Sequence, residues 1–105
     1  MRTRVVITGL GTINPLGTDV AATSSSATSG KSGIGPITHF NPGKHKTRFA
    51  GEVRGFDPES RFGRKDARRM DRFVQFAHVA TEEAISDAQL RITDSNRDLI
   101  GVVIG

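Results

Sequence analysis

The chain ends on Ile100-Gly101-Val102-Val103-Ile104-Gly105, a run that predicts a β-strand covered on both of its faces. Such a strand needs neighbouring strands beside it and helices above and below it. A second apolar run, residues 4–8, opens the chain and leads into Gly9 and Gly11. Because two such strands and about two helices do not close a doubly covered sheet, we expect the chain to be the front part of a larger α/β protein.

The pattern between these runs predicts helices that alternate with short strands, an order typical of an α/β fold with parallel pairing. A weak helix is expected over residues 19–29, where serine and threonine are frequent and an apolar stripe is almost absent. Residues 49–53 predict a short strand, and Pro58 the start of a helical turn. The strongest helix is expected from about residue 64 to residue 88. Its apolar stripe consists of Met70, Phe73, Val74, Ala77, Ala84, Ile85 and Ala88.

The composition excludes several kinds of site. With no cysteine among 105 residues, the chain has no disulfide framework, no thiolate nucleophile and no cysteine-ligated zinc. The basic start is followed by an apolar stretch that glycines interrupt too early for a signal peptide or a membrane span. We therefore expect a cytoplasmic protein with no membrane partner.

The net charge of +4 is concentrated in residues 61–72, where six basic residues stand against two acidic ones. A confined basic cluster favours an acidic partner. The alternative is a solvated helix face on which Asp66 and Asp71 pair with the cations. Cations near the start of a helix oppose its macrodipole, which favours a binding role. The basic residues are Arg61, Arg64, Lys65, Arg68, Arg69 and Arg72.

The glycine motifs do not fit nucleotide sites, and we expect no cofactor. The run Thr28-Ser29-Gly30-Lys31-Ser32 resembles a phosphate-binding loop, but Ser25 stands where that loop needs its first glycine. Gly9-Leu10-Gly11 lacks the third glycine of a dinucleotide-binding turn, because Asn14 occupies that place. Nucleic-acid binding is also disfavoured, since the chain has no tyrosine, tryptophan or recognisable reading motif.

The ionisable side chains outside the basic cluster predict no metal site and no catalytic residue. The histidines share no spacing typical of metal ligands, and each is expected to be packed or at the surface. The carboxylates of the long helix are expected to be solvated. These residues are His39, His45 and His78, and Glu82, Glu83 and Asp87.

Six segments of the chain form one ordered set: Arg4-Val5-Val6-Ile7-Thr8-Gly9-Leu10-Gly11, Asn14-Pro15-Leu16-Gly17, Gly30-Lys31-Ser32-Gly33-Ile34, Arg48-Phe49-Ala50-Gly51-Glu52-Val53, Arg68-Arg69-Met70-Asp71-Arg72-Phe73 and Ile100-Gly101-Val102-Val103-Ile104-Gly105. In register over essentially the whole chain, they resemble the opening of a β-ketoacyl-acyl carrier protein synthase, the type II elongating enzyme of bacterial fatty acid synthesis. This resemblance implies the truncated N-terminal part of a thiolase-like fold, with residues 1–105 as a fragment of the N-terminal domain and a homodimeric parent.

The resemblance implies an acyltransferase that condenses an acyl thioester with malonyl-acyl carrier protein, with loss of carbon dioxide. The family's catalytic cysteine and two histidines lie beyond position 105, so none is assigned here and the chain alone is expected to be inactive. Two alternatives stay open: a non-catalytic basic-helix module that docks an acidic protein, and the ketosynthase part of a polyketide synthase.

The family's carrier-protein docking patch does lie within this chain. The resemblance implies that Lys65, Arg68 and Arg69 bind the acidic recognition helix of acyl carrier protein, in its acyl and malonyl forms. The chain departs from the family elsewhere. In the first helix, larger apolar residues of the family are replaced by Ser24, Ala27 and Thr28. At the end of the long helix, Gln89 replaces a glycine.

Overall fold

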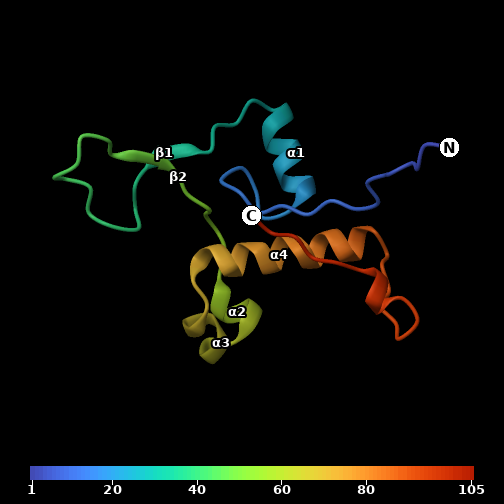
Figure 1. Cartoon of the computed structure of the whole chain (residues 1–105). Coiled ribbons are helices and arrows are strands. Elements are labelled where there is room, and N and C mark those ends of the chain that lie inside the picture. The colour runs from blue at the N-terminus through green and yellow to red at the C-terminus, as the bar shows by residue number, and fades with distance from the viewer.

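Helix α4, Arg72–Asp87, is the element on which the rest of the chain is arranged in the computed structural model, which describes all 105 residues (Figure 1). The Cα radius of gyration is 17.3 Å, against about 13 Å for a compact domain of 100 residues. Only Glu52, Ala67, Gln75 and Val79 are buried. The other elements are α1 (Val20–Thr28), β1 (Ile34–Pro36), β2 (Phe49–Gly51), α2 (Pro58–Phe62), α3 (Arg64–Arg69) and a 3₁₀ turn, Arg97–Leu99.

The single long helix predicted over residues 64–88 is wrong, because the structure divides it into α3 and α4. Met70 adopts an extended backbone conformation, with φ of −106° and ψ of 131°, and α4 begins after Asp71. The predicted apolar stripe also does not match the buried face. The buried side chains of α4 are Gln75 and Val79, one turn apart, whereas Phe73 is 72% exposed.

Helix α1 confirms the expected first helix. Asp19 caps it by accepting a hydrogen bond of 2.7 Å from the backbone N–H of Ala22. No residue of α1 is buried, which agrees with the loss of large side chains from its packing face. Two other local expectations are confirmed: Pro58 opens α2, and Gln89 has a positive φ of 52° just after α4.

The sheet differs from the predicted parallel one. It has two strands, β1 and β2, which pair antiparallel with Ile34 opposite Gly51 and Pro36 opposite Phe49. Residues 37–48 form a loop between them, and parallel pairing would need a crossover connection instead. A strand is therefore present at Phe49–Gly51, within the expected residues 49–53, and its partner lies in residues for which no strand was predicted.

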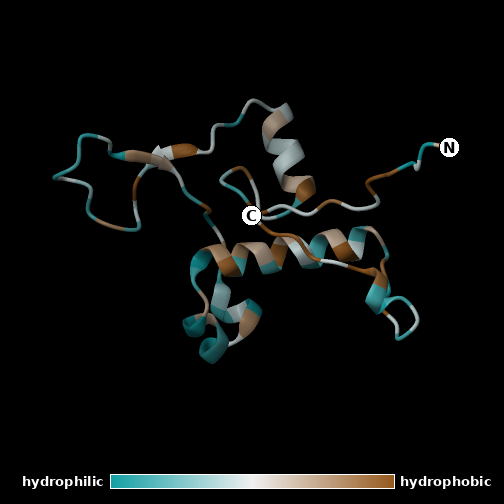
Figure 2. Cartoon of the chain, in the orientation of Figure 1, coloured by the Kyte–Doolittle hydropathy of each residue, from teal (hydrophilic) through white to brown (hydrophobic).

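The two terminal apolar runs are coil, so the strands predicted at residues 4–8 and 100–104 are wrong for this structure. A strand exists only through hydrogen bonds to a partner, and neither run has one. Val5 is 92% exposed and Val103 is 99% exposed. The C-terminal run lies along α4, where Figure 2 shows its apolar residues in brown, whereas the N-terminal run extends away from the end of the helix. None of the helices combines the length and the hydropathy needed to span a bilayer.

Residues 9–12 lie against the C-terminal half of α4. A Cβ added at Gly9 or Gly11 would overlap backbone carbonyl oxygens of Ala84 or Ala80. The backbone N–H of Leu10 donates to Asp87 at 2.9 Å, and that of Thr12 donates to Glu83 at 2.9 Å.

The spacings of the two elements match. Two extended residues span about 6.6 Å, and four helical residues rise about 6.0 Å. Glu83 also accepts from the backbone N–H of Val20, so it holds both ends of the turn that precedes α1. The expectation that Glu83 and Asp87 are merely solvated is therefore wrong.

Candidate functional site

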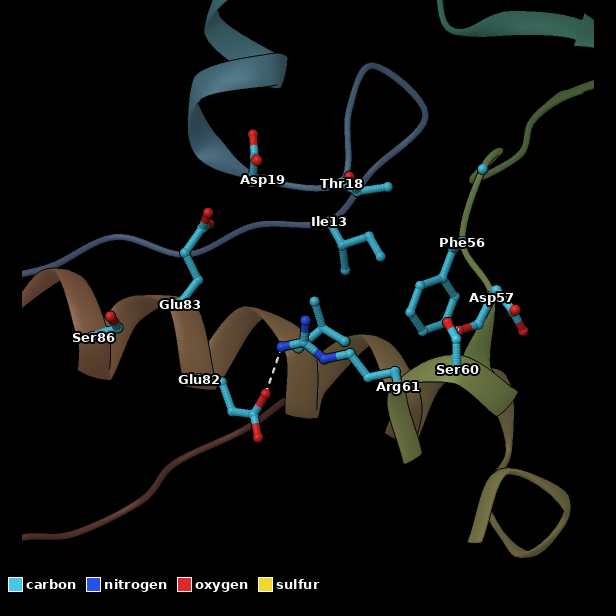
Figure 3. A pocket seen from close by; sticks show the side chains of 12 residues that line it. Ile13, Thr18, Asp19, Phe56, Asp57, Ser60, Arg61, Glu82, Glu83 and Ser86 are labelled. Carbon is cyan, nitrogen blue, oxygen red and sulfur yellow. Dashed lines mark hydrogen bonds and ion pairs between the residues drawn. The ribbon is translucent and has the colours of Figure 1, made fainter. Parts of the chain in front are cut away.

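The basic cluster lies on α2, α3 and the first residue of α4, at one end of the molecule (Figure 1). Figure 2 shows α3 as strongly hydrophilic. Two of the six cations of the basic cluster, Arg61 and Arg72, interact with other residues of the chain. Arg61 forms an ion pair with Glu82 of α4, drawn in Figure 3. Arg72 donates to the carbonyl oxygen of Val53 at 3.0 Å, and its guanidinium carbon lies 5.1 Å from the ring centre of Phe76.

The other four cations are free. All of them are exposed, and none has a carboxylate oxygen within 4.0 Å. Asp66 and Asp71 are exposed as well and form no ion pair, so the alternative of a face balanced by these two carboxylates finds no support. The free cations are Arg64, Lys65, Arg68 and Arg69, which all belong to α3.

The structure thus places the three docking residues named by the resemblance on one short helix. Their arrangement changes the electrostatic argument made from the sequence. Because α3 ends at Arg69, Arg68 and Arg69 lie in its last turn, where cations are favourable to the macrodipole. The argument that these two cations oppose a macrodipole is therefore wrong. The observation that favours a binding role is instead that neither cation has a carboxylate partner.

Gln75 is a residue of this region that sequence reasoning missed. It is 5% exposed and lies on α4 facing α3. Its side-chain Nε2 donates to the carbonyl oxygens of Ala67, at 3.0 Å, and Met70, at 3.3 Å. A polar residue outside the apolar stripe gives no sign of burial in the sequence, because that burial depends on the break between α3 and α4.

Helix α2 is attached to α4 by its own contacts. The ring of Phe62 meets the ring of His78 edge to face, with centroids 5.2 Å apart. His78 also lies 3.4 Å from Glu82, the partner of Arg61. These contacts join α2 to α4.

A pocket of about 680 Å³ lies beside this region, between α2, α4 and the turn before α1 (Figure 3). Its polar lining includes Asp19, Asp57, Arg61, Glu82 and Glu83. The hydroxyls of Thr18, Ser60 and Ser86 also reach it. No histidine or cysteine lines the pocket, so it holds no nucleophile with an imidazole base beside it.

His39 and His45 lie in the loop between β1 and β2, His78 lies on α4, and each has a different neighbour. His39 approaches Glu52 at 3.0 Å, His45 meets the ring of Phe40, and His78 contacts Phe62. Desolvation favours the protonated form of Glu52, but hydrogen bonds from Thr38 and His39 and the charge of His39 outweigh it and lower the pKa of this carboxyl. No group of three or more His, Asp or Glu side chains is arranged to hold a metal.

Comparison with known proteins identifies the family. Residues 2–105 match the model of the beta-ketoacyl synthase N-terminal domain. The chain is 48% identical over 102 residues to 3-oxoacyl-[acyl-carrier-protein] synthase 2 of Staphylococcus aureus (strain N315), a match that covers 97% of this chain and 25% of the relative. The relative of the same name from Synechocystis sp. is also 48% identical, over 97% of this chain and 24% of the relative.

The chain therefore spans about a quarter of the length of the curated relatives that it matches. The family match includes all six segments on which the resemblance rests, and it gives the fold class as α/β and thiolase-like, of which the observed helices and small sheet are a part. The chain belongs to the beta-ketoacyl synthase family, within the N-terminal domain.

Proposed function

We propose that the chain acts as part of a 3-oxoacyl-[acyl-carrier-protein] synthase in fatty acid elongation. The family match and the names of its relatives support this assignment. In the proposed reaction a cysteine thiolate attacks the acyl thioester, takes the acyl group and releases the thiol that carried it. Malonyl-acyl carrier protein then loses carbon dioxide, and the resulting enolate attacks the acyl-enzyme and releases the cysteine. The chain holds no cysteine, so we expect condensation only when the remainder of a synthase supplies it.

Residues 1–105 are, in this proposal, the first part of the N-terminal domain of a cytoplasmic homodimer. Their contribution is substrate delivery rather than covalent chemistry. Lys65, Arg68 and Arg69 bind the acidic surface of acyl carrier protein, in both its acyl and malonyl forms. The observation that carries this role is that every cation of α3 lacks a carboxylate partner, whereas Arg61 and Arg72 are occupied.

The test uses a chimera in which this chain replaces the matching quarter of the Staphylococcus aureus relative. Rim charges act mostly on association rate, so the double reversal Arg68→Glu, Arg69→Glu should slow association with acyl carrier protein several-fold at low salt. Raised ionic strength should shrink the difference, because salt screens exposed charges. Stopped-flow association at two ionic strengths measures both effects.

The matched control is the double reversal Lys44→Glu, Lys46→Glu. These two lysines are also exposed and without an ion pair, but they lie in the loop between β1 and β2. The control changes the net charge equally and should leave most of the association rate intact. An unchanged rate in the α3 variant, or equal slowing by both variants, refutes docking on α3.

The free cations also fit a non-catalytic module that docks an acidic protein. The chimera separates this candidate from the synthase. If the chimera binds acyl carrier protein and forms no 3-oxoacyl product, while the intact relative does, the assignment to the condensing enzyme is wrong and the docking module is favoured.

A further inference from the structure

Helix α3 carries all four free cations but has only six residues. A helix of that length is not stable in water on its own, so other parts of the chain must fix its position. Its last carbonyl groups have no partners within the helix. Helix α3 packs against α2, which leads directly into it. The direction in which Lys65, Arg68 and Arg69 point therefore depends on that packing and on what binds the C-terminal end of α3.

Gln75 binds it. The side chain of this residue reaches from α4, and its Nε2 carries two N–H donors. One acceptor is Ala67, inside α3, and the other is Met70, just after the helix ends. Both the glutamine and Ala67 are buried, at 5% and 8% exposure. The link is thus a water-shielded one between α4 and the end of the docking helix.

The geometry of α3 explains why this link controls the cations. Successive residues of a helix are rotated by about 100°. Lys65 and Arg69 therefore lie on the side of α3 opposite Ala67, and Arg68 lies at its flank. All three are exposed, in agreement with that placement. Holding Ala67 against α4 turns the cations away from the molecule.

The remaining side-chain contacts do not duplicate this role. Arg61 and Phe62, which contact α4, belong to α2 rather than α3. Arg72 fixes the segment around Val53 and Phe56. No other side chain donates a hydrogen bond to a carbonyl of α3.

We propose that Gln75 is a positioning residue for carrier-protein docking, because it fixes the orientation of α3 through two hydrogen bonds to its C-terminal end. This inference rests on the proposed function. It assigns a buried residue to the recognition of an acidic partner.

The test variant is Gln75→Leu in the chimera, which keeps the size of the side chain and removes both donors. Its readout is the KM for acyl and malonyl groups carried by acyl carrier protein, divided by the KM for the same groups as pantetheine thioesters. Small thioesters lack the carrier protein and its charged surface. We expect this ratio to rise roughly fivefold, because several weak charge contacts are misdirected together.

Gln89→Leu is the matched control, since Gln89 is exposed and its side chain makes no hydrogen bond. Its KM ratio should stay within about twofold of the parent, as expected of a surface change. Gln75→Glu provides a second variant. A carboxylate there lacks donors, whereas the protonated acid has one O–H. Docking by Gln75→Glu should therefore be weak at neutral pH and recover as the pH falls.

Each outcome is decisive. An unchanged KM ratio for Gln75→Leu, or equal losses for both kinds of substrate, overturns the positioning role. If Gln75→Leu does not fold, a Gln75→Glu chimera with no recovery in acid, relative to the parent at the same pH, overturns it as well. Failure of the proposed function is recognised separately, because then Arg68→Glu, Arg69→Glu leaves carrier association unchanged.

Discussion

The two halves of α4 hold their neighbours by opposite chemistry. In the N-terminal half, Gln75 donates hydrogen bonds to carbonyl groups at the end of α3. In the C-terminal half, Glu83 and Asp87 accept hydrogen bonds from backbone N–H groups of the N-terminal segment. A neutral side chain thus leaves the cations of α3 free, whereas the carboxylates of the other half are used in the fold. The C-terminal half of α4 thus uses its charged side chains to bind other segments of the chain. The N-terminal half holds α3 in a way that leaves the charges of α3 available to a partner.

The largest expected effect is on the C-terminal half of α4. Gly11→Ala places a methyl group where it overlaps the backbone carbonyl of Ala80. Since backbone atoms cannot yield as a flexible side chain does, we expect the free energy of unfolding of the chimera to fall by about 3 kcal/mol. Urea unfolding measures it.

Gly101→Ala is the control for this change, because nothing lies within 4 Å of a Cβ added there. It should change the stability by less than about 0.5 kcal/mol. Equal effects of the two substitutions would show that residues 9–12 do not lie directly on α4, and the comparison between its two halves would fail.

Much of this arrangement follows from local sequence, and the parts that do not have a common cause. Asp19 and Pro58 mark helix starts that local capping rules identify. The basic cluster was also found from the sequence. The break at Met70 was not, because no glycine or proline marks it. Burial of Gln75 depends on that break, and the hydrogen bonds of Glu83 join residues 71 and 63 positions apart. Long-range contacts of this kind leave no local pattern.

The same reasoning applies to the terminal runs. Residues 4–8 and 100–104 have the composition of buried strands, but a strand is a property of a pair. With no partner beside them in this structure, both are coil. The composition of these runs therefore predicts that they would be strands inside a covered sheet. Whether they form strands depends on the neighbouring segments that are present.

A smaller effect is expected from the carboxylate that spans the turn before α1. Glu83→Gln removes a charged acceptor that binds the backbone N–H groups of Thr12 and Val20. Hydrogen bonds to charged groups contribute about 1.5–3 kcal/mol, and the amide oxygen of glutamine retains part of that. We expect stability to fall by about 1.5 kcal/mol and amide exchange at Thr12 and Val20 to accelerate.

Glu59→Gln is the control for Glu83→Gln, since the carboxylate of Glu59 is exposed and accepts no hydrogen bond. It should change neither measurement appreciably. If the two glutamine variants unfold at the same urea concentration, Glu83 does not hold the turn, and α4 would then position only the basic end of the molecule.

The smallest effect separates occupied from free cations within the basic cluster. Arg61 is paired with Glu82, and Arg64, three residues later, has no partner. Arg64→Gln should slow association with acyl carrier protein by less than about threefold at low salt and leave stability unaffected, because one exposed charge contributes about 0.2–1 kcal/mol. Arg61→Gln should do the reverse, since its loss leaves Glu82 with only His78 beside it and loosens α2 from α4. Association rates and urea midpoints of both variants, measured side by side in the chimera, decide the matter. If Arg61→Gln slows association as much as Arg64→Gln does at unchanged stability, the division between structural and docking cations is wrong, and the whole cluster acts as one diffuse field.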